Sequence, residues 1–380
     1  MNLALMNGQA PVRAFVAVFV LLLFPMFARG QNQSTAFDDL VFRATGAREQ
    51  NDVPRAIELY SQAVQLNPKW SDGWWFLGSL QNGAGSYAAA RDALSHYVEL
   101  TPNAGPAIAL RGLCEFETGD YAEALADIQH GMSLGAANQP RNEQILRYHE
   151  AQLLTRIGKF EEALKAYAFF APQRVSDPEL LVAVGLAGLR VSLLPKDVNV
   201  GQQDLLRSAG NAALQFMAGD QNAARQSFQD FFQRFPGVEN AHYLYGYLLF
   251  TADPDEAIME FERELQNAPS NLAAQVMAAW ALLMRNRSAE ALPYAEKAAV
   301  QEPALPAAQL VLGRSLLEDG NLKAGLEHLE KAQQLEPNNL ETHIALAKAY
   351  SKAGRKEDAQ RERRLCLQMA KNETIQFAQP

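Results

Sequence analysis

Residues 306–337 read PAAQLVLGRSLLEDGNLKAGLEHLEKAQQLEP, and the two halves of this stretch carry two separate helical patterns. Each half places apolar and small residues on one helical face, namely Leu312, Gly313 and Leu316, then Leu329 and Ala332. Between the halves, Asp319-Gly320-Asn321 is typical of a turn. Pro337 lacks a backbone donor and therefore ends the second helix. The stretch predicts a pair of short antiparallel helices.

The same stop signal recurs at a nearly constant spacing. Prolines follow helical patterns at positions 68, 102, 236, 269, 303 and 337, and three of the intervals between consecutive members are 34 residues. Glycines that predict turns between paired helices lie at positions 119, 158, 219, 320 and 354. One helix pair cannot bury its apolar face alone, so neighbouring pairs must stack and share a continuous core.

This pattern resembles the tetratricopeptide repeat (TPR), over residues 37 to about 370. The resemblance rests on small residues where the two helices of a pair cross and on large residues around that crossing. The clearest matches are Ala56, Tyr60, Trp74, Gly78, Ala90, Ala124, Ala163, Tyr167, Ala224, Gly246, Ala257, Phe261, Ala291, Gly313 and Tyr350. The resemblance implies an all-α fold, namely a right-handed α-solenoid of about nine helix pairs.

The repeat pattern is interrupted in the middle of the chain. We expect about four repeats at 37–175 and about five at 205–370, with a linker at 31–36 and a tail at 371–380. Residues 176–204 read as one helix followed by a loop, without the second helix of a standard pair. This segment is either a worn repeat that bends the array or a hinge or docking loop.

The first thirty residues are set apart by composition. Residues 1–30 contain two arginines, no acid, an apolar run and then Ala28 and Gly30, which is typical of a cleaved secretory signal. The sequence therefore predicts an exported protein, either periplasmic or secreted. The alternative is an uncleaved N-terminal anchor, the one case in which we expect membrane contact.

The composition excludes several functions. The net charge of −9 argues against nucleic-acid binding, which needs a basic surface. Two cysteines, Cys114 and Cys366, cannot build a disulfide framework, and we expect both to be buried free thiols. The six histidines form no metal-ligand spacing, and we expect each to be an ordinary surface or helix residue. No catalytic, metal or cofactor motif is present, so we expect no enzyme and no cofactor.

The remaining candidate site is the concave groove, which the TPR resemblance assigns to the first helix of each repeat. At these positions the chain carries mainly apolar and aromatic side chains, and bases appear only near the C-terminal end. The candidate partner-binding residues are Trp75, Phe116, Tyr148, Tyr243, Tyr247, Trp280, Arg314 and Lys348. The alternative is that a tight superhelix buries these side chains between neighbouring repeats.

The residues therefore favour an exported, non-catalytic scaffold that binds a protein or peptide in its groove, because Trp and Tyr are good interface anchors. The lysine and asparagine clamp that holds a C-terminal carboxylate in chaperone-binding members of the family is absent. The alternative function is an accessory subunit of a polysaccharide or secretion machinery that binds a carbohydrate or a membrane component.

Overall fold

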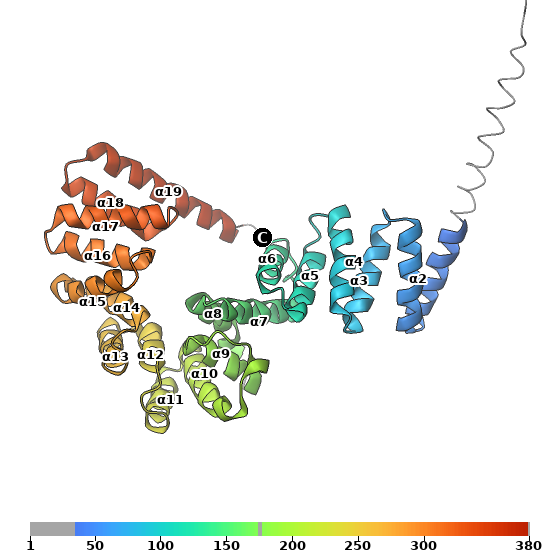
Figure 1. Cartoon of the computed structure of the whole chain (residues 1–380), viewed down its shortest axis with the longest axis horizontal. Coiled ribbons are helices and arrows are strands. Elements are labelled where there is room, and N and C mark those ends of the chain that lie inside the picture. The colour runs from blue at the N-terminus through green and yellow to red at the C-terminus, as the bar shows by residue number, and fades with distance from the viewer. Residues whose placement is uncertain (1–34, 174–176, 379–380) are drawn as a thin grey trace, which may run out of the picture. The chain divides into compact units, whose positions relative to one another are not determined.

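The computed structural model describes residues 35–173 and 177–378 of the chain. All regular secondary structure in these ranges is helical (Figure 1), which confirms the all-α prediction. None of these helices is both long enough and apolar enough to cross a bilayer. The predicted signal at 1–30 lies outside the described residues. The chain forms two compact units, which we call unit 1 (up to Leu153) and unit 2 (from Leu154) and describe separately.

Unit 1 consists of helix pairs. A helix at 35–49 packs on α2 through Ala44, Ala56 and Tyr60. The further helices are α2 (Val53–Leu66), α3 (Ser71–Gly83), α4 (Tyr87–Leu100), α5 (Gly105–Thr118) and α6 (Tyr121–Ser133). α7 (Pro140–Arg156) follows and runs past the division between the units. From α2 to α6, each helix packs on the next, as the TPR resemblance predicts.

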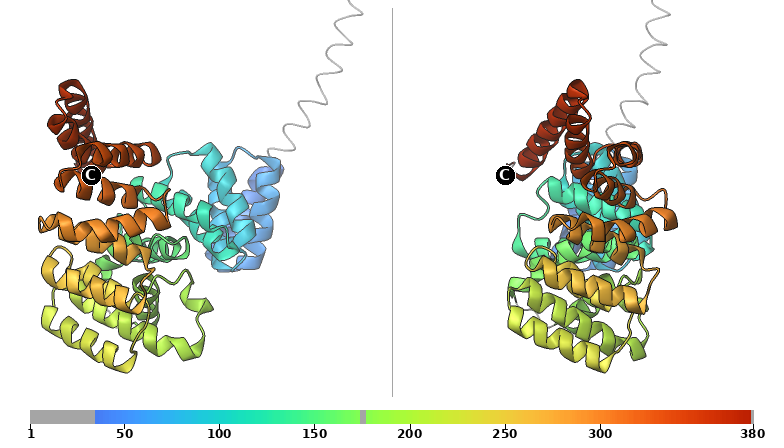
Figure 2. Two further views of the ribbon diagram at one scale, coloured as in Figure 1. Left: turned by 60° about the vertical axis from the view of Figure 1, so that its left-hand side comes forward. Right: turned by 90° about the vertical axis from the view of Figure 1, so that its left-hand side faces the viewer.

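Unit 2 continues with helix pairs after an irregular start (Figure 2). The start comprises α8 (Phe160–Tyr167), α9 (Pro178–Gly188) and the 3-10 turns Ala168–Gln173, Pro195–Asp197 and Val200–Gln202. The pairs comprise α10 (Gln203–Met217), α11 (Gln221–Arg234), α12 (Ala241–Leu249), α13 (Pro254–Asn267), α14 (Leu272–Met284), α15 (Ser288–Gln301), α16 (Pro306–Glu318), α17 (Leu322–Leu335), α18 (Leu340–Lys352) and α19 (Lys356–Ala378). α19 thus extends beyond residue 370, where the sequence pattern ends.

Prolines and glycines set the helix boundaries as predicted. Six helices each end two residues before a predicted stop proline: α2, α4, α11, α13, α15 and α17. All five predicted turn glycines have positive φ, between 74° and 91°. Glycine adopts this left-handed conformation without the penalty that a Cβ atom imposes. The 34-residue period therefore follows from the local backbone preferences of proline and glycine.

Small residues hold the two helices of a pair close together. A Cβ atom built on Gly112 of α5 would lie 3.0 Å from the backbone oxygen of Ala124 on α6. Ala124 itself is fully buried. Larger side chains at this crossing would push the helices apart, which costs packing energy.

A repeated hydrogen bond links each of four repeats to the stop proline before it. The fourth residue of the repeat donates a side-chain N–H to the proline carbonyl six positions earlier. The donors are Trp74 to Pro68 (2.9 Å), Gln275 to Pro269 (2.9 Å), Gln309 to Pro303 (3.0 Å) and His343 to Pro337 (2.8 Å). Because a backbone carbonyl outside a helix has no partner within the helix, these bonds pair the proline carbonyls and stabilise the connection between pairs.

The irregular segment contains one helix, α9, followed by a loop with two 3-10 turns. α10, which begins the next repeat, packs against α9. The two helices approach very closely, because a Cβ atom on Gly185 would lie 2.1 Å from the Leu206 carbonyl oxygen and one on Gly210 would lie 2.0 Å from that of Leu181. The predicted extents of the repeat blocks stay predictions.

Candidate partner-binding pocket

A pocket opens on unit 1 where first helices of consecutive pairs come together. The predicted groove residue Trp75 on α3 lines it, together with Ala109 and Leu113 on α5. The pocket has a volume of about 410 Å³. Its lining is completed by Asn82, Pro106, Leu110, Ala136, Asn142, Ile145 and Leu146. Trp75 is therefore the one predicted partner-binding residue among those that line this pocket.

Contacts with residues outside the lining hold the pocket walls in place. The Trp75 ring lies against Tyr97 of α4, with ring centroids 5.6 Å apart, and it packs on the core cluster that includes Leu94. The Cys114 thiol donates to Asn82 Oδ1 at 3.4 Å and so orients that amide. Rigid walls favour binding, because little side-chain entropy is lost when a ligand enters.

The lining of the pocket carries no charge. None of its ten residues is an acid or a base, although the whole chain has a net charge of −9. Two amides, Asn82 and Asn142, are the polar groups of the lining. Ile145 keeps 38% of its surface exposed, so part of this aliphatic side chain is accessible to a ligand. The pocket can therefore take an uncharged, largely apolar group.

Two predicted residues of unit 1 lie outside this pocket. Phe116 is buried, at 5% exposed, and packs edge-on against His149 with centroids 4.8 Å apart. Tyr148 is half-buried and also packs against His149. The structure thus places these two rings in helix packing.

In unit 2, Tyr243 is buried in a polar contact. Its hydroxyl donates to Glu161 Oε1 at 2.6 Å, and the Arg190 guanidinium pairs with the same carboxylate and lies 5.1 Å from the Tyr243 ring. Burial, followed by the Glu161 charge, holds the pKa of Tyr243 well above its usual value. Tyr247 stacks beside it and is half-buried. The buried ring therefore ties α12 to α8 and to the end of α9.

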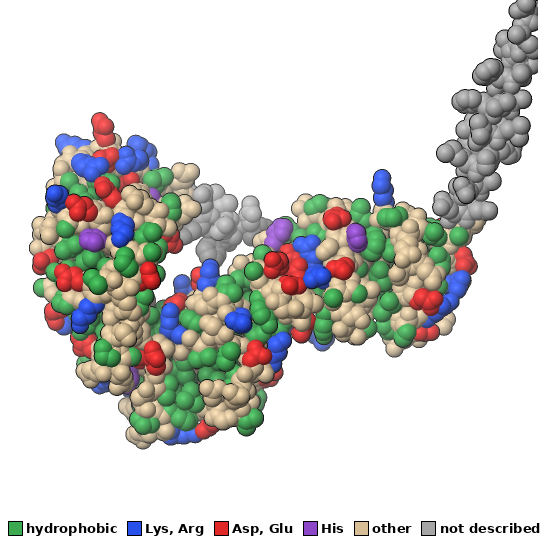
Figure 3. Space-filling view, in the orientation of Figure 1, with side chains coloured by type: hydrophobic (Ala, Val, Ile, Leu, Met, Phe, Trp, Pro, Cys, Tyr) green, Lys and Arg blue, Asp and Glu red, His purple; other side chains and the backbone are tan. Residues whose placement is uncertain are grey.

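The other predicted residues of unit 2 are engaged with neighbours. The Arg314 guanidinium lies 4.7 Å from the centroid of the half-buried Trp280 ring. Lys348 is exposed and forms an ion pair with Glu318. Lys and Arg side chains gather with carboxylates over α18 and α19 (Figure 3). This face therefore offers paired charges in place of an open apolar pocket.

The cysteines and histidines partly differ from their predictions. Cys114 is fully buried, and burial raises the pKa of its thiol to about 11, so it is protonated at neutral pH. Cys366 is half-buried, contrary to the expectation of a buried residue. His343 lies inside the fold, at 2% exposed, against a carboxylate. Among residues 35–173 and 177–378, no group of acids, cysteines and histidines could hold a metal ion.

Sequence reasoning missed several members of the pocket. Asn82 lies on α3, the first helix of its repeat, but the predicted partner-binding residues were mainly aromatic. Asn142, Ile145 and Leu146 lie at the start of α7, where a five-residue insertion shifts the repeat register. Attention to amides at groove positions would have found Asn82, whereas the α7 residues need the three-dimensional arrangement.

Comparison with known proteins identifies the repeats. Residues 43–105 and 248–308 match one model described as tetratricopeptide repeat, and residues 316–362 match another. A 56-residue segment is 39% identical to the human protein O-mannosyl-transferase TMTC1, covering 15% of this chain and 6% of that protein. The chain therefore spans a small part of that relative.

Solved structures with a similar arrangement include two MamA structures. One is titled MamA RS-1 ArsTM double mutant, with 19% identity, a TM-score of 0.40, and coverage of 44% of this chain and 96% of that chain. The other is MamA 41-end from Desulfovibrio magneticus RS-1, with 21% identity, a TM-score of 0.38, and coverage of 45% and 96%. The repeat-model matches, together with the stacked helix pairs, show that this chain is a tetratricopeptide-repeat protein.

Proposed function

We propose that the chain is an exported, non-catalytic scaffold that binds a protein or peptide partner through the unit 1 pocket. The observation that carries this proposal is the uncharged pocket between α3, α5 and α7, which contains the predicted groove residue Trp75. Concave, apolar pockets with a few polar groups are the usual form of binding sites. A protein-interaction role also agrees with the tetratricopeptide family.

The lining indicates the chemistry of the bound segment. A charged side chain in this pocket would lose its hydration without gaining an ion pair, which is costly. An aliphatic or aromatic side chain would bury its surface against Trp75, Leu113 and Ile145. The amides of Asn82 and Asn142 can donate to and accept from a peptide backbone. The partner segment is therefore uncharged at its anchor.

The carbohydrate alternative receives less support from the same lining. Sugars present many hydroxyl groups, and each buried hydroxyl needs a hydrogen-bond partner. The pocket offers two amides and no carboxylate. A peptide with an apolar anchor makes fewer such demands than a sugar.

The proposal of a non-catalytic role agrees with the state of the buried thiol. The Cys114 thiol contacts the pocket amide Asn82 but is not itself part of the pocket lining. Its raised pKa, about 11, leaves almost no thiolate at neutral pH. Cys114 therefore supports the pocket wall and does not attack a ligand.

Export is proposed from residues 1–30 alone. Mass spectrometry of the chain made in its native cell would measure the N-terminus. A chain that begins near Gln31 supports a cleaved signal, whereas an intact chain in the membrane fraction supports an anchor.

Peptide selection against residues 31–380 tests the binding proposal. We expect selected peptides to share an apolar anchor, and Ile145→Glu to weaken their binding by about tenfold or more because it places a charge at the pocket. Val300→Glu is the matched control, since Val300 is 80% exposed and lies on α15 of unit 2. Equal binding by both variants would refute the pocket, and selection of glycans without any peptide would favour the carbohydrate alternative.

A further inference from the structure

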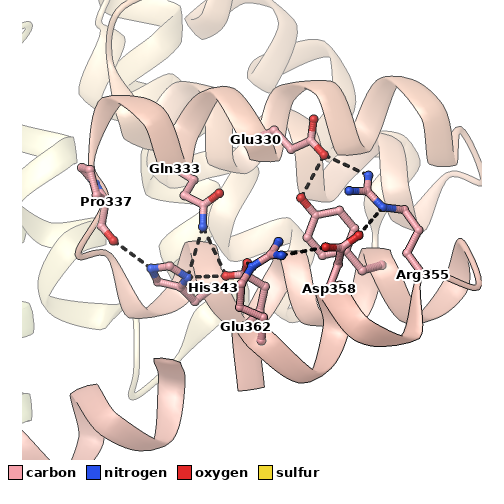
Figure 4. A network of polar contacts seen from close by, with 9 residues as sticks. Glu330, Gln333, Pro337, His343, Arg355, Asp358 and Glu362 are labelled. Carbon is pink, nitrogen blue, oxygen red and sulfur yellow. Dashed lines mark hydrogen bonds and ion pairs between the residues drawn. The ribbon is translucent and has the colours of Figure 1, made fainter. Parts of the chain in front are cut away.

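His343 on α18 has both ring nitrogens beside hydrogen-bond acceptors. Nε2 lies 2.8 Å from the Pro337 carbonyl oxygen, and Nδ1 lies 2.6 Å from Glu362 Oε2 on α19 (Figure 4). His343 is 2% exposed and Glu362 is 1% exposed. The pair therefore joins the last two described helices in a site that water does not reach.

This geometry requires a proton between the two side chains. A carbonyl oxygen only accepts, so Nε2 must carry a hydrogen. A neutral imidazole then has a lone pair on Nδ1, which would face a carboxylate oxygen across 2.6 Å. Two acceptors at that distance repel each other, so one further proton must lie between Nδ1 and Oε2. It belongs either to an imidazolium beside a carboxylate or to a neutral imidazole beside a carboxylic acid.

The polar groups around His343 and Glu362 do not remove the need for a proton between these two side chains. From α17, Gln333 Nε2 donates to Glu362 Oε2 at 3.2 Å and lies 3.5 Å from His343 Nδ1. From α19, Arg361 Nε donates to Glu362 Oε1 at 3.3 Å. The other charged or titratable groups around the pair are Glu330, Glu341, Tyr350, Arg355, Asp358 and Cys366. Glu330 accepts from Tyr350 and Arg355, and Asp358 pairs with Arg355 and Arg361 (Figure 4), so neither approaches the shared proton.

The preceding repeat shows the same contact without the extra proton. Gln309 and His328 occupy the equivalent positions, since both pairs are separated by 19 residues. Gln309 donates to the Pro303 carbonyl at 3.0 Å and accepts from His328 Nδ1 at 2.7 Å. An amide has both a donor and an acceptor, so this pair is complete when neutral.

A second histidine–glutamate pair in unit 2 can form its hydrogen bond with a neutral imidazole and needs no extra proton. His242 Nδ1 lies 2.6 Å from Glu260 Oε2, at the corresponding contact between α12 and α13. Its Nε2 has no hydrogen-bond partner in the described part of the chain, so a neutral ring can donate from Nδ1. The extra proton is therefore a property of the His343 site.

We propose that His343 and Glu362 form a proton-dependent latch, in which one shared proton holds α19 against α18 and its loss releases α19. We call the state with α19 packed on α18 closed and the state with α19 released open. A free histidine loses its proton at about pH 6.5, so above this pH the closed state binds one proton more than the open state. Opening therefore increases as pH rises, by at most about tenfold per pH unit. The stabilisation of packed α19 by the latch is therefore fully present below about pH 6.5 and is lost as the pH rises above that value.

Hydrogen exchange of the 31–380 chain tests the latch without any substitution. Protection of α19 amides, corrected for intrinsic exchange, should fall by up to about tenfold per pH unit between about pH 7 and about pH 9. Protection of α13, held by His242 and Glu260, should stay constant. Equal pH dependence of α13 and α19, or constant protection of α19, would overturn the latch.

Two variants test the assignment of the proton. The double swap His343→Gln with Glu362→His installs the neutral pair of the preceding repeat. We expect it to keep α19 protected and to abolish the pH dependence. If the swap does not fold, Glu362→Gln is the second test, because its amide donates to neutral His343. A folded variant that keeps the wild-type pH dependence would show that another group carries the proton.

Discussion

The first-helix faces of unit 1 and unit 2 occupy the same repeat positions but present different surfaces. In unit 1, Trp75 and Leu113 open onto an uncharged pocket. In unit 2, Tyr243 is bound to Glu161 and Arg190, and Lys348 is paired with Glu318. The repeat register therefore determines which side a residue faces, whereas its neighbours determine whether it is available to a partner.

Two buried acids, Glu264 of unit 2 and Glu115 of unit 1, differ in how their carboxylate oxygens are paired. Glu264 of unit 2 is fully buried and accepts from the backbone N–H groups of Asn240 and Tyr243 at the start of α12. Glu115 of unit 1 is 8% exposed, and its Oε2 atom has no hydrogen-bond partner. Both oxygens of Glu264 are therefore paired inside unit 2, whereas one oxygen of Glu115 on α5, a helix that lines the unit 1 pocket, has no partner among the described residues.

The largest expected effect concerns the close pair of helices at the start of unit 2. Gly210→Ala places a Cβ atom about 2.0 Å from the Leu181 carbonyl oxygen, so α9 and α10 must separate. We expect unit 2 to lose about 3 kcal/mol, because backbone cannot yield as a side chain does. Hydrogen exchange resolved by unit should show the loss in unit 2 alone. Gly83→Ala in α3 meets no atom within 4 Å and serves as the control.

Glu115→Gln should stabilise unit 1 at alkaline pH. Burial, followed by the Asp127 charge, raises the pKa of Glu115 to about 7, above its value in an unfolded chain. The folded state therefore binds a proton that the unfolded chain has lost. The free energy of unfolding is highest below about pH 4, and it falls as the pH rises from about 4 to about 7. The variant should gain about 2 kcal/mol at about pH 8. Exposed Glu117→Gln on the same helix should change nothing, and a gain at low pH alone would contradict this reading.

Tyr243→Phe tests whether this ring supports the fold or contacts a partner. It removes the hydroxyl that donates to Glu161 and should cost unit 2 about 1 kcal/mol in denaturant unfolding. Tyr247→Phe should cost less, because no hydrogen bond from its hydroxyl is present in the described structure. Unchanged stability with weakened peptide binding would instead make Tyr243 a contact residue.

The smallest effect should come from the exposed groove face of unit 2. Ile344→Glu changes a side chain that is 48% exposed and lies on α18, a first helix like α7. Binding of peptides selected for the unit 1 pocket should stay within about twofold of wild type, as for most substitutions outside an interface core. A loss comparable with that of Ile145→Glu would remove the distinction between the two faces.

Local sequence signals were sufficient for the helix pairs and part of the pocket. Pro337 and Gly320 act through their own backbone, so their effects could be predicted from the sequence. Trp75 was identified by its place in the repeat. The role of Tyr243 could not be predicted, because its partners Glu161 and Arg190 lie 82 and 53 residues away in the chain. The packing of α9 on α10 could not be predicted, because a loop with two 3-10 turns separates the two helices in the sequence.

Hydrogen exchange of the 31–380 chain with and without a selected peptide tests the central claim most directly. The unit 1 pocket predicts new protection over α3, α5 and the first turns of α7, which carry Trp75, Leu113 and Ile145. It predicts no change over α14, α16 and α18. Protection confined to those three helices would contradict the account and place the partner on the first-helix face of unit 2.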